Sequence, residues 1–566
     1  MHEELVPIVS GRVNIAQYLR RQAEDQPHKR ALILPRGHQK DGAALSQSYT
    51  FAQIEEISGN RARALATLGV QRGQRVLVAI RPGIDLISIS FALFKLGAAP
   101  VFIDPGMGKE GLLNCIRQAR AAAIIGGTPA MLFALSRRKD FGGCELFIST
   151  GRTPLPGVKR LKMVKIAAGD HSVADTQASD VAAILFTSGS TGPAKGVVYT
   201  HGIFAHQTEM IRKAYGVTTQ DVDMSVFPLF ALFAICMGMP SVVPRIDFSH
   251  PGKVDPEPLV QLMNDYGVSF SFGSPAFWTR VAEWCEAHER SLPSVRALVM
   301  AGCSVPADLH RRFFDGLLPA GADIFVPYGA TEALPLCSFK GSEVLRYAAA
   351  KSLAGAGTCV GSVISDKLAV KIIRISDEAQ PEWDDSLVLP DGEIGEVVCR
   401  GPVVTQEYFE SEAANAKSKI RDGRRIWHRM GDLGYLDANG LLWFCGRKNE
   451  RLETSSGLLC TDSVENVFNY DDDVRRSALV GIGPRGQQRP VLIVQPKDSN
   501  LLRDPIRLET LRQELLVLGA ACPGSALVRT ILFKEDFPLD VRHNAKIKRD
   551  ILAKWAAEQL SKSTTK

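Results

Sequence analysis

A loop rich in glycine and hydroxyl side chains, LFTSGSTGPAKGV at residues 185–197, is well suited to binding an anion. Glycines let a backbone approach phosphate oxygens, hydroxyl groups donate hydrogen bonds, and Lys195 adds a positive charge. The segment is not a P-loop, because Ala194 and Gly196 replace the second glycine and the final hydroxyl residue of a pattern that starts at Gly189. A flexible linker is the alternative, but a linker rarely follows an apolar strand directly. We therefore predict a phosphate site of another kind.

Strand and helix patterns that would position this loop alternate through the first 355 residues. Apolar strands are predicted at 75–80, 100–104, near 122, 181–186, 268–273, 295–302 and 323–329. Helical patterns lie between them, and one opens with a capping box at Thr50 and Gln53 and ends at Gly69. This alternation predicts βαβ units and largely parallel sheets covered on both faces. Residues 187–196 then form a loop beyond the carboxyl end of a strand, where ligands bind in open α/β sheets.

The pattern changes after about residue 355. Short strands with glycine turns, and no helices between them, are predicted at 368–375, 392–402 and 440–447. A new α/β pattern begins after Gly446 and includes a helix at 505–518. We therefore expect an α/β protein with two domains. The first, at residues 1–449, combines parallel αβα subdomains with a small β-barrel-like subdomain, and the second, at 450–566, is a small mobile α+β domain.

The composition indicates an ordinary globular protein of more than one domain. Its 566 residues are 45% hydrophobic and 23% charged, and they exceed the size of one core. A net charge of +6 suits small anionic substrates, and no basic tract predicts nucleic-acid binding. Eleven cysteines without a C-x-x-C pair argue against disulfides and zinc and favour a cytoplasmic location.

Two segments bear on targeting and membranes. The N-terminus lacks the basic-then-apolar layout of a signal peptide. Residues 224–244 carry no charge and are long enough to span a bilayer, but they contain three prolines. We expect a buried strand–loop–helix passage there, and a peripheral membrane contact stays open.

Five segments resemble, in the right order, the motifs of the adenylate-forming superfamily, which includes acyl-CoA synthetases, peptide-synthetase adenylation domains and luciferases. They are TSGSTGPAKG (187–196), YGATE (328–332), WHRMGD (427–432), GRKNE (446–450) and FPLDVRHNAKIKR (537–549). The resemblance covers roughly residues 50–550. It implies an AMP-forming ligase that uses ATP and Mg²⁺ to make an acyl-adenylate. Met430 and Glu450 depart from the usual threonine and aspartate.

The resemblance also implies roles for individual residues. The implied catalytic residues are Lys546, Glu332, Lys195 and Thr331, with Glu332 as the magnesium ligand as well. The implied nucleotide-binding residues are Thr187, Ser188, Gly189, Ser190, Thr191, Gly192, Gly302, Cys303, Tyr328, Gly329, Ala330, Asp432 and Arg447. Tyr328 would stack on adenine, Asp432 and Arg447 would bind the ribose, and Glu450 would be the interdomain hinge.

Three of these residues also have a purely structural interpretation. Glu332 could cap a following helix, Tyr328 could be a core aromatic residue, and Lys546 could be a solvated surface charge. The chemistry nevertheless fits, because a carboxylate must attack the α-phosphorus of ATP and two anions must meet beside cations. Lys195 suits pyrophosphate, and Lys546 suits a position between carboxylate and phosphate.

Two departures weaken the case for a thiol acceptor. Ser455 and Ser456 stand where thioester-forming relatives have the glycines of a thiol tunnel, and Ala231 stands at the usual histidine of P-L-F-H. With these departures, the sequence resembles a β-lactone-forming branch of the superfamily in bacterial olefin biosynthesis. That resemblance implies ring closure by the 3-hydroxyl group of a 2-alkyl-3-hydroxy fatty acid, and a multienzyme assembly with a decarboxylase.

Two other functions stay open from the sequence. A long-chain acyl-CoA synthetase is the nearest alternative, and a non-catalytic nucleotide-binding scaffold is the more distant one. Apolar stretches around Phe230 and at residues 273–278 are candidates for the acyl pocket.

Overall fold

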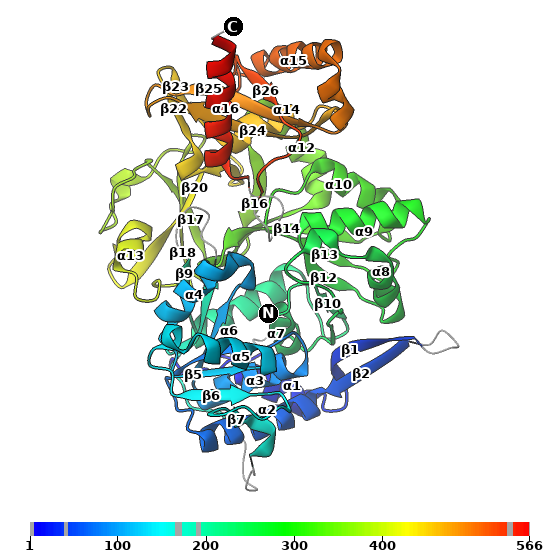
Figure 1. The fold of residues 1–566 in the computed structure, drawn as a ribbon, viewed down its shortest axis with the longest axis vertical. Helices are drawn as coiled ribbons and strands as arrows, with labels where there is room; N and C mark the ends of the chain where they lie inside the picture. The colour runs from blue at the N-terminus through cyan, green and yellow to red at the C-terminus, as the bar shows by residue number, and fades with distance from the viewer. Residues whose placement is uncertain (1–4, 39–43, 165–171, 188–193, 540–546, 565–566) are drawn as a thin grey trace.

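A computed structural model describes residues 5–38, 44–164, 172–187, 194–539 and 547–564. Two large sheets lie one beyond the other along the molecule, and the residues after 450 form its far end (Figure 1). The described helices are α1 (Ala16–Asp25), α2 (Phe51–Leu68), α3 (Ile84–Leu96), α4 (Gly108–Ala119), α5 (Thr128–Ser136), α6 (His201–Ala214), α7 (Phe230–Cys236), α8 (Pro256–Asp265), α9 (Pro275–Ala287), α10 (Ala307–Arg312), α11 (Gly341–Glu343), α12 (Ala349–Lys351), α13 (Glu412–Ser418), α14 (Thr461–Phe468), α15 (Pro505–Ala520) and α16 (Arg549–Thr564).

The first sheet has seven strands, and the two strands that flank the predicted phosphate loop lie at one edge. In sheet order they are β7 (Lys159–Arg160), β6 (Leu146–Ser149), β5 (Ala123–Gly126), β3 (Arg75–Ala79), β4 (Ala99–Ile103), β8 (Val181–Thr187) and β9 (Lys195–Thr200). All neighbours are parallel except β8 and β9. Val76 and Val78 pack in the cluster with α2 and α3, and Leu77 packs in the cluster with α4 and α5. Because successive strand residues face opposite sides, both faces of this sheet are covered, as predicted.

The predicted capping box of α2 is confirmed. Thr50 accepts a hydrogen bond from the Gln53 backbone, and the Gln53 side chain accepts one from the Thr50 backbone. Gly69 ends the helix in the left-handed region, at a φ of 105°.

The second sheet is mixed. Its strands in order are β17 (Ala369–Ile373), β18 (Gly395–Arg400), β20 (Arg425–Leu436), β21 (Leu442–Arg447), β16 (Thr358–Val363), β15 (Ala333–Lys340), β14 (Asp323–Ala330), β13 (Ala297–Met300), β12 (Phe270–Gly273), β10 (Asp223–Ser225), β11 (Ser241–Val242), β1 (Arg30–His38) and β2 (Ala44–Thr50), with β19 (Lys419–Asp422) beside β20. The run from β11 to β14 is parallel, and every neighbouring pair in the run from β14 to β20 is antiparallel.

The strands after residue 355 continue the large sheet, because β16 pairs with β15. One expectation about them is wrong: they are not free of helices, since α13 lies between β18 and β20 in the sequence.

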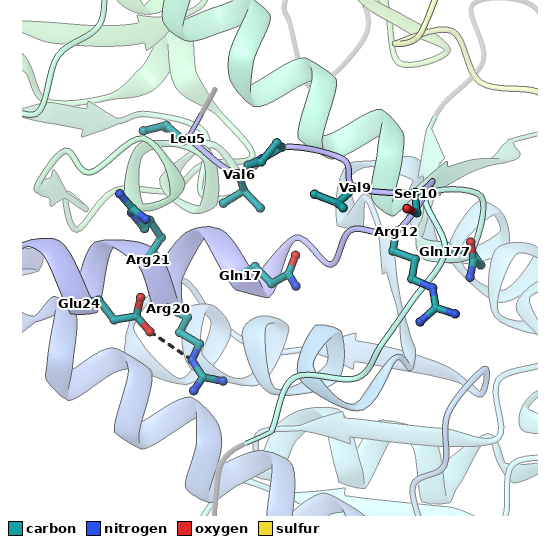
Figure 2. Close-up of a pocket in the computed structure, with 11 residues that line it drawn as sticks. Leu5, Val6, Val9, Ser10, Arg12, Gln17, Arg20, Arg21, Glu24 and Gln177 are labelled. Atoms are coloured by element: carbon teal, nitrogen blue, oxygen red, sulfur yellow. Dashed lines mark ion pairs between the residues drawn. The ribbon is translucent and has the colours of Figure 1, made fainter. Parts of the chain in front are cut away.

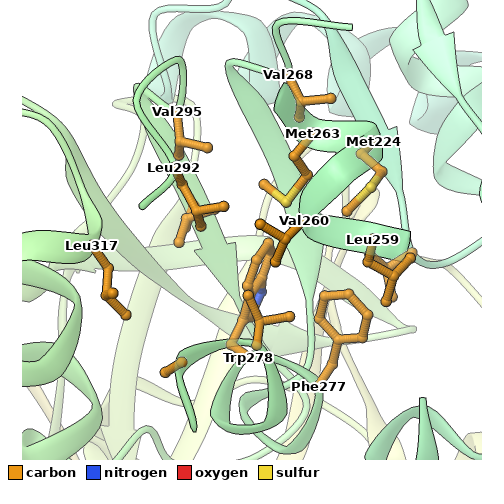
Figure 3. Packing of buried hydrophobic residues seen from close by; sticks show 14 of the residues in the cluster. Met224, Leu259, Val260, Met263, Val268, Phe277, Trp278, Leu292, Val295 and Leu317 are labelled. Atoms are coloured by element: carbon orange, nitrogen blue, oxygen red, sulfur yellow. The ribbon is translucent and has the colours of Figure 1, made fainter. Parts of the chain in front are cut away.

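Residues 224–244 form β10, α7 and β11, in agreement with the predicted strand–loop–helix passage. Among the described residues, no helix is long and apolar enough to cross a membrane. Residues 273–278 lead into α9, where Phe277 and Trp278 are fully buried in the core with α8 (Figure 3). A place for these two aromatic side chains in the acyl pocket stays a prediction.

The C-terminal residues have cores of their own. They form a hairpin of β22 (Leu452–Thr454) and β23 (Gly457–Leu459), and a sheet of β24 (Val474–Ile482), β25 (Arg489–Pro496) and β26 (Ile531–Phe533). Two hydrophobic clusters cover this sheet, and every member of both lies at or after residue 452. A chain segment with separate cores is expected to unfold as a separate unit.

We predict that Leu479→Ala and Leu298→Ala destabilise different units. Both leucines are fully buried, one in the core after residue 452 and the other in the core that contains Trp278. Each truncation is expected to cost about 2–5 kcal/mol of unfolding free energy in its own unit. Differential scanning calorimetry should show each variant lowering a different transition. One common transition lowered by both variants would contradict two independent cores.

Candidate active site

The predicted site residues come from several places in the fold, beginning with the β8–β9 pair and the turn from β14 into β15. Thr187 ends β8 and pairs with Lys195, the first residue of β9, so the two ends of the predicted phosphate loop lie on neighbouring antiparallel strands. Tyr328 lies near the end of β14, and Thr331 and Glu332 form the turn into β15. Because β15 is a strand, the alternative that Glu332 caps a following helix is wrong.

Six predicted residues cannot be placed. Ser188, Gly189, Ser190, Thr191, Gly192 and Lys546 lie outside the described residues. Their roles stay predictions from the sequence.

A buried carboxylate brings together three predicted nucleotide-binding residues. The Tyr328 hydroxyl donates a hydrogen bond of 2.7 Å to Asp432 Oδ2, and Arg447 Nη1 donates one of 2.7 Å to Asp432 Oδ1. Asp432 in β20 pairs with Arg447 in β21, which fixes both side chains on one side of the sheet. Burial raises the pKa of Asp432, and the guanidinium of Arg447 opposes that effect. Tyr328 is thus a bonded member of a polar group rather than a purely apolar core residue.

Glu332 belongs to a second polar group that includes a residue missed from the sequence. Tyr408 is buried, and its hydroxyl donates a hydrogen bond of 2.6 Å to Glu332 Oε1. The Lys195 Nζ lies 4.7 Å from the centre of the Tyr408 ring. Thr331 is held from the other side, because its backbone oxygen accepts a hydrogen bond of 2.5 Å from the Tyr199 hydroxyl.

Lys419 is the second residue that the sequence did not reveal. Its Nζ donates to the Thr405 backbone oxygen and, at 3.2 Å, to Thr405 Oγ1, and it lies 5.5 Å from the Tyr408 ring centre. Burial lowers the pKa of this lysine to about 8, and the nearby Glu332 opposes that effect. Both missed residues lie between the motifs at 328–332 and 427–432, and only their buried positions distinguish them.

The Glu332 carboxylate fits a magnesium ligand. Its Oε2 receives no hydrogen bond from any residue that the structure describes, while Tyr408 binds Oε1. Among the described residues, no group of three or more His, Cys, Asp or Glu side chains is arranged so that it could hold a metal ion by itself. Mg²⁺ suits such a place, because it is commonly held by one or two carboxylates together with substrate phosphates.

The other predicted nucleotide-binding residues line the ends of neighbouring strands. Gly302, in the left-handed region at a φ of 104°, and Cys303 follow β13, while Gly329 and Ala330 end β14. A Cβ atom at Gly329 would lie 2.5 Å from the Ala333 oxygen. Only glycine therefore fits where β14 turns into β15.

The predicted hinge residue is part of an ion-pair chain. Glu450 Oε2 lies 2.9 Å from Arg549 Nε, and Arg549 Nη1 lies 2.7 Å from Glu465 Oε1. Arg549 is three residues beyond Lys546. The ion pairs therefore join position 450 to the end of the motif at 537–549. Ser455 and Ser456 form the exposed turn between β22 and β23.

A narrow apolar cavity adjoins the Glu332 turn. It is lined by Ile211, Tyr215, Asp223, Phe230, Phe233, Ala234, Met237, Met239, Phe270, Phe272, Val299, Pro327, Leu334 and Pro335. Its volume of about 40 Å³ is far below the ~300–1,000 Å³ typical of small-molecule sites. Phe230, a candidate residue of the acyl pocket, lines this cavity and stacks on Phe272 at 4.2 Å between ring centres. A long acyl chain would need such side chains to move.

Asp223 is the one carboxyl group in this cavity wall. Ser241 donates a hydrogen bond of 2.8 Å to its Oδ2, and Ser225 also donates to that atom. Burial raises the pKa of Asp223 to about 7. The group is therefore neutral over much of the acidic range.

A larger depression of about 830 Å³ lies beside the N-terminal segment (Figure 2). Its wall includes Arg12, Gln17 and the Arg20–Glu24 ion pair at 3.4 Å. None of its lining residues belongs to the five motifs, so it is not part of the candidate site.

Comparison with known proteins agrees with this geometry. A sequence model described as AMP-binding enzyme matches residues 19–409, and the chain belongs to this family of adenylate-forming ligases. It is 42% identical over 553 residues to the olefin beta-lactone synthetase of Xanthomonas campestris pv. campestris, covering 96% of this chain and 98% of the relative. It is 40% identical over 570 residues to the olefin beta-lactone synthetase of Stenotrophomonas maltophilia, covering 97% and 99%.

A solved structure extends the comparison to the fold. The o-succinylbenzoate coenzyme A synthetase of Bacillus subtilis, in complex with ATP and magnesium ion, has a TM-score of 0.71 at 20% identity and covers 94% of this chain and 98% of its own. The predicted fold, with a large N-terminal part and a smaller C-terminal part, is confirmed. Adenylate-forming enzymes use ATP.

We predict that Asp223→Asn reduces the pH dependence of stability. The pKa of Asp223 is about 7 in the folded protein and about 3.9 in an unfolded chain, so between these values the folded protein alone keeps the proton. The stabilisation by the protonated group is complete below about pH 4 and is lost as the pH rises through 7. Urea unfolding at pH 5 and pH 8 should show the wild type losing about 2–3 kcal/mol more than the variant. Equal losses would contradict a neutral Asp223.

Proposed function

We propose that this protein converts 2-alkyl-3-hydroxy fatty acids to β-lactones through an acyl-adenylate, with ATP and Mg²⁺. The observation that carries the proposal is the identity of 40–42% to two proteins named olefin beta-lactone synthetase over nearly the whole chain. Retention of Lys195, Glu332 and Asp432 also favours catalysis over a non-catalytic scaffold.

The first step joins the substrate to AMP. A carboxylate oxygen of the acid attacks the α-phosphorus of ATP, and the bond to the β,γ-diphosphate breaks to release pyrophosphate. Lys195 binds phosphate oxygens, Glu332 holds Mg²⁺ when it is bound, and the Tyr328–Asp432–Arg447 group orients the nucleoside. Bound Mg²⁺ would neutralise phosphate charge. Lys546, which lies outside the described residues, would stabilise the negative charge that develops as the carboxylate meets the α-phosphate.

The second step closes the ring. The 3-hydroxyl oxygen attacks the activated carbonyl carbon, the carbonyl–AMP bond breaks, and the hydroxyl proton leaves to solvent. The original carboxylate oxygen departs on AMP, so the acid loses one water in all. Holding the hydroxyl group at attacking distance offsets part of the ring strain, because effective molarities of oriented groups are large.

A long-chain acyl-CoA synthetase is the second candidate, since a structural neighbour is named a coenzyme A synthetase. The Ser455–Ser456 turn argues against it, because each Cβ would narrow a slot that other family members line with glycine. Ala231, fully buried in α7, also lacks the imidazole expected at its position.

The remaining proposals concern movement and partners. We propose that residues 450–566 act as a mobile lid that turns about Glu450. The protein would work in the cytoplasm in an assembly with a decarboxylase that consumes the β-lactone, and a peripheral membrane contact would give access to the long-chain substrate.

The test is product analysis with a long-chain 2-alkyl-3-hydroxy acid, ATP and Mg²⁺, with and without coenzyme A. We expect a product that is lighter than the acid by one water, with AMP released, in both mixtures. Mass spectrometry and NMR identify the four-membered ring. A thioester formed only with coenzyme A would instead establish the acyl-CoA synthetase.

Lys546→Ala tests the adenylation step. We expect adenylate formation to fall by at least about 100-fold, because the group that stabilises developing charge is lost, while ATP binding changes little. Isothermal titration measures ATP binding, and pyrophosphate release in single turnover measures adenylation. Lys548→Ala, two residues away, is the matched control. Unimpaired turnover of the Lys546 variant would refute the role.

A further inference from the structure

One short segment, residues 403–408, contacts both strand β9 and the turn that contains Glu332. Val404 forms a β-bridge with Ala333. The Thr405 backbone N–H donates a hydrogen bond of 2.8 Å to the backbone carbonyl oxygen of Glu332. At its other end the segment forms a β-bridge between Tyr408 and Val197 of β9. The two halves of the candidate phosphate site are therefore held at a fixed separation by this segment.

Tyr408 makes the same connection through its side chain. Its hydroxyl binds Glu332 Oε1 at 2.6 Å, and its ring lies 4.7 Å from Lys195 Nζ. The backbone of Tyr408 is held by Asn415. Its N–H donates a hydrogen bond of 2.7 Å to Asn415 Oδ1, and its carbonyl oxygen accepts one of 3.1 Å from Asn415 Nδ2. Tyr408 is 4% exposed, so water does not compete for the hydroxyl.

The Tyr408 ring also offers a position to two positively charged side chains. Lys195 and Lys419 both lie over Tyr408, at 4.7 and 5.5 Å, and the structure gives no ion pair between Glu332 and either lysine within the described residues. A lysine bound directly to Glu332 would compete with a metal ion for the same oxygens. Attraction to the ring quadrupole offers the ammonium groups another position.

We propose that Tyr408 is a positioning residue for the magnesium–ATP site: its hydroxyl group holds the Glu332 carboxylate with one oxygen free, and its ring holds Lys195. This inference rests on the proposed function, in which Glu332 holds Mg²⁺. Removing a side chain that hydrogen-bonds to a metal ligand commonly lowers the affinity for the metal by about 10- to 100-fold.

Tyr408→Phe is the direct test, because it removes the hydroxyl group and keeps the ring for Lys195. We expect the Mg²⁺ concentration for half-maximal ATP–pyrophosphate exchange to rise by about 10-fold or more. We also expect Mn²⁺ to bind the complex with a non-hydrolysable ATP analogue correspondingly more weakly, measured by electron paramagnetic resonance. Affinity for the analogue without metal should stay within about twofold, since the ring still holds Lys195.

Tyr199→Phe is the matched control. It removes a buried hydroxyl that bonds the Thr331 backbone at 2.5 Å, in the same turn but away from the carboxylate. This variant should leave the Mn²⁺ affinity unchanged, and equal losses in both variants would overturn the inference. So would a folded Tyr408→Phe protein with wild-type metal dependence.

A second set of variants distinguishes a specific effect of Tyr408→Phe on metal binding from a general folding defect. Glu332→Gln removes the proposed metal ligand, so adding Tyr408→Phe to it should cause no further change in Mg²⁺ dependence. An additive effect would overturn the coupling between the two residues. A wild type whose adenylation needs no divalent metal would overturn the proposed function instead, which separates the two failures.

Discussion

The carboxylate of Asp432 constrains the shape of the second sheet. Three strands lie between β20, which carries it, and β14, which carries Tyr328. Four steps at about 4.8 Å would separate the two backbones by about 19 Å in a flat sheet, too far for a tyrosine to span. The observed bond of 2.7 Å therefore requires this half of the sheet to curl strongly. The predicted barrel-like character after residue 355 is present in this curvature, although the strands belong to the large sheet.

Because Asp432 is buried, its carboxylate depends on the hydrogen bonds from Tyr328 and Arg447. Asp432 is 3% exposed, and a charged carboxylate removed from water is costly unless it is paired and hydrogen-bonded. Tyr328 and Arg447 each satisfy one oxygen. A nucleoside approaching this group would meet side chains that already hold one another in place. Glu332 differs, because Tyr408 satisfies only one of its oxygens, and Asp223 differs again, because burial beside serine hydroxyls favours its neutral form. Three carboxyl groups thus have three different charge environments.

Local patterns allowed much of the fold to be predicted, and long-range contacts account for what was missed. The parallel strands and the Thr50 cap follow from periodicity and from spacing within a few residues, so both were predicted correctly. Tyr408 lies 76 residues from Glu332, and no local pattern reports a contact between such distant positions. The same limit applies to the aromatic residues at 277 and 278: their composition is apolar, but only the packing of α8 and α9 places them in the core.

The proposed choice between acceptors follows from where the nucleophile comes from. A thiol must enter through a channel, so a thioester-forming enzyme needs an open slot beside the lid. A hydroxyl group on the substrate enters together with the acid, so no separate channel is needed for the nucleophile. The acyl-binding part of the proposed site must instead accommodate two alkyl chains. The cavity beside Leu334 holds about 40 Å³, and the Phe230–Phe272 stack closes much of it. Apolar rings can yield to an alkyl chain with little loss, since ring–ring contact is exchanged for chain–ring contact of similar character. A narrow and mostly apolar wall is therefore compatible with the proposed ring closure, whereas Ser455 and Ser456 are departures that weaken the case for a thiol acceptor.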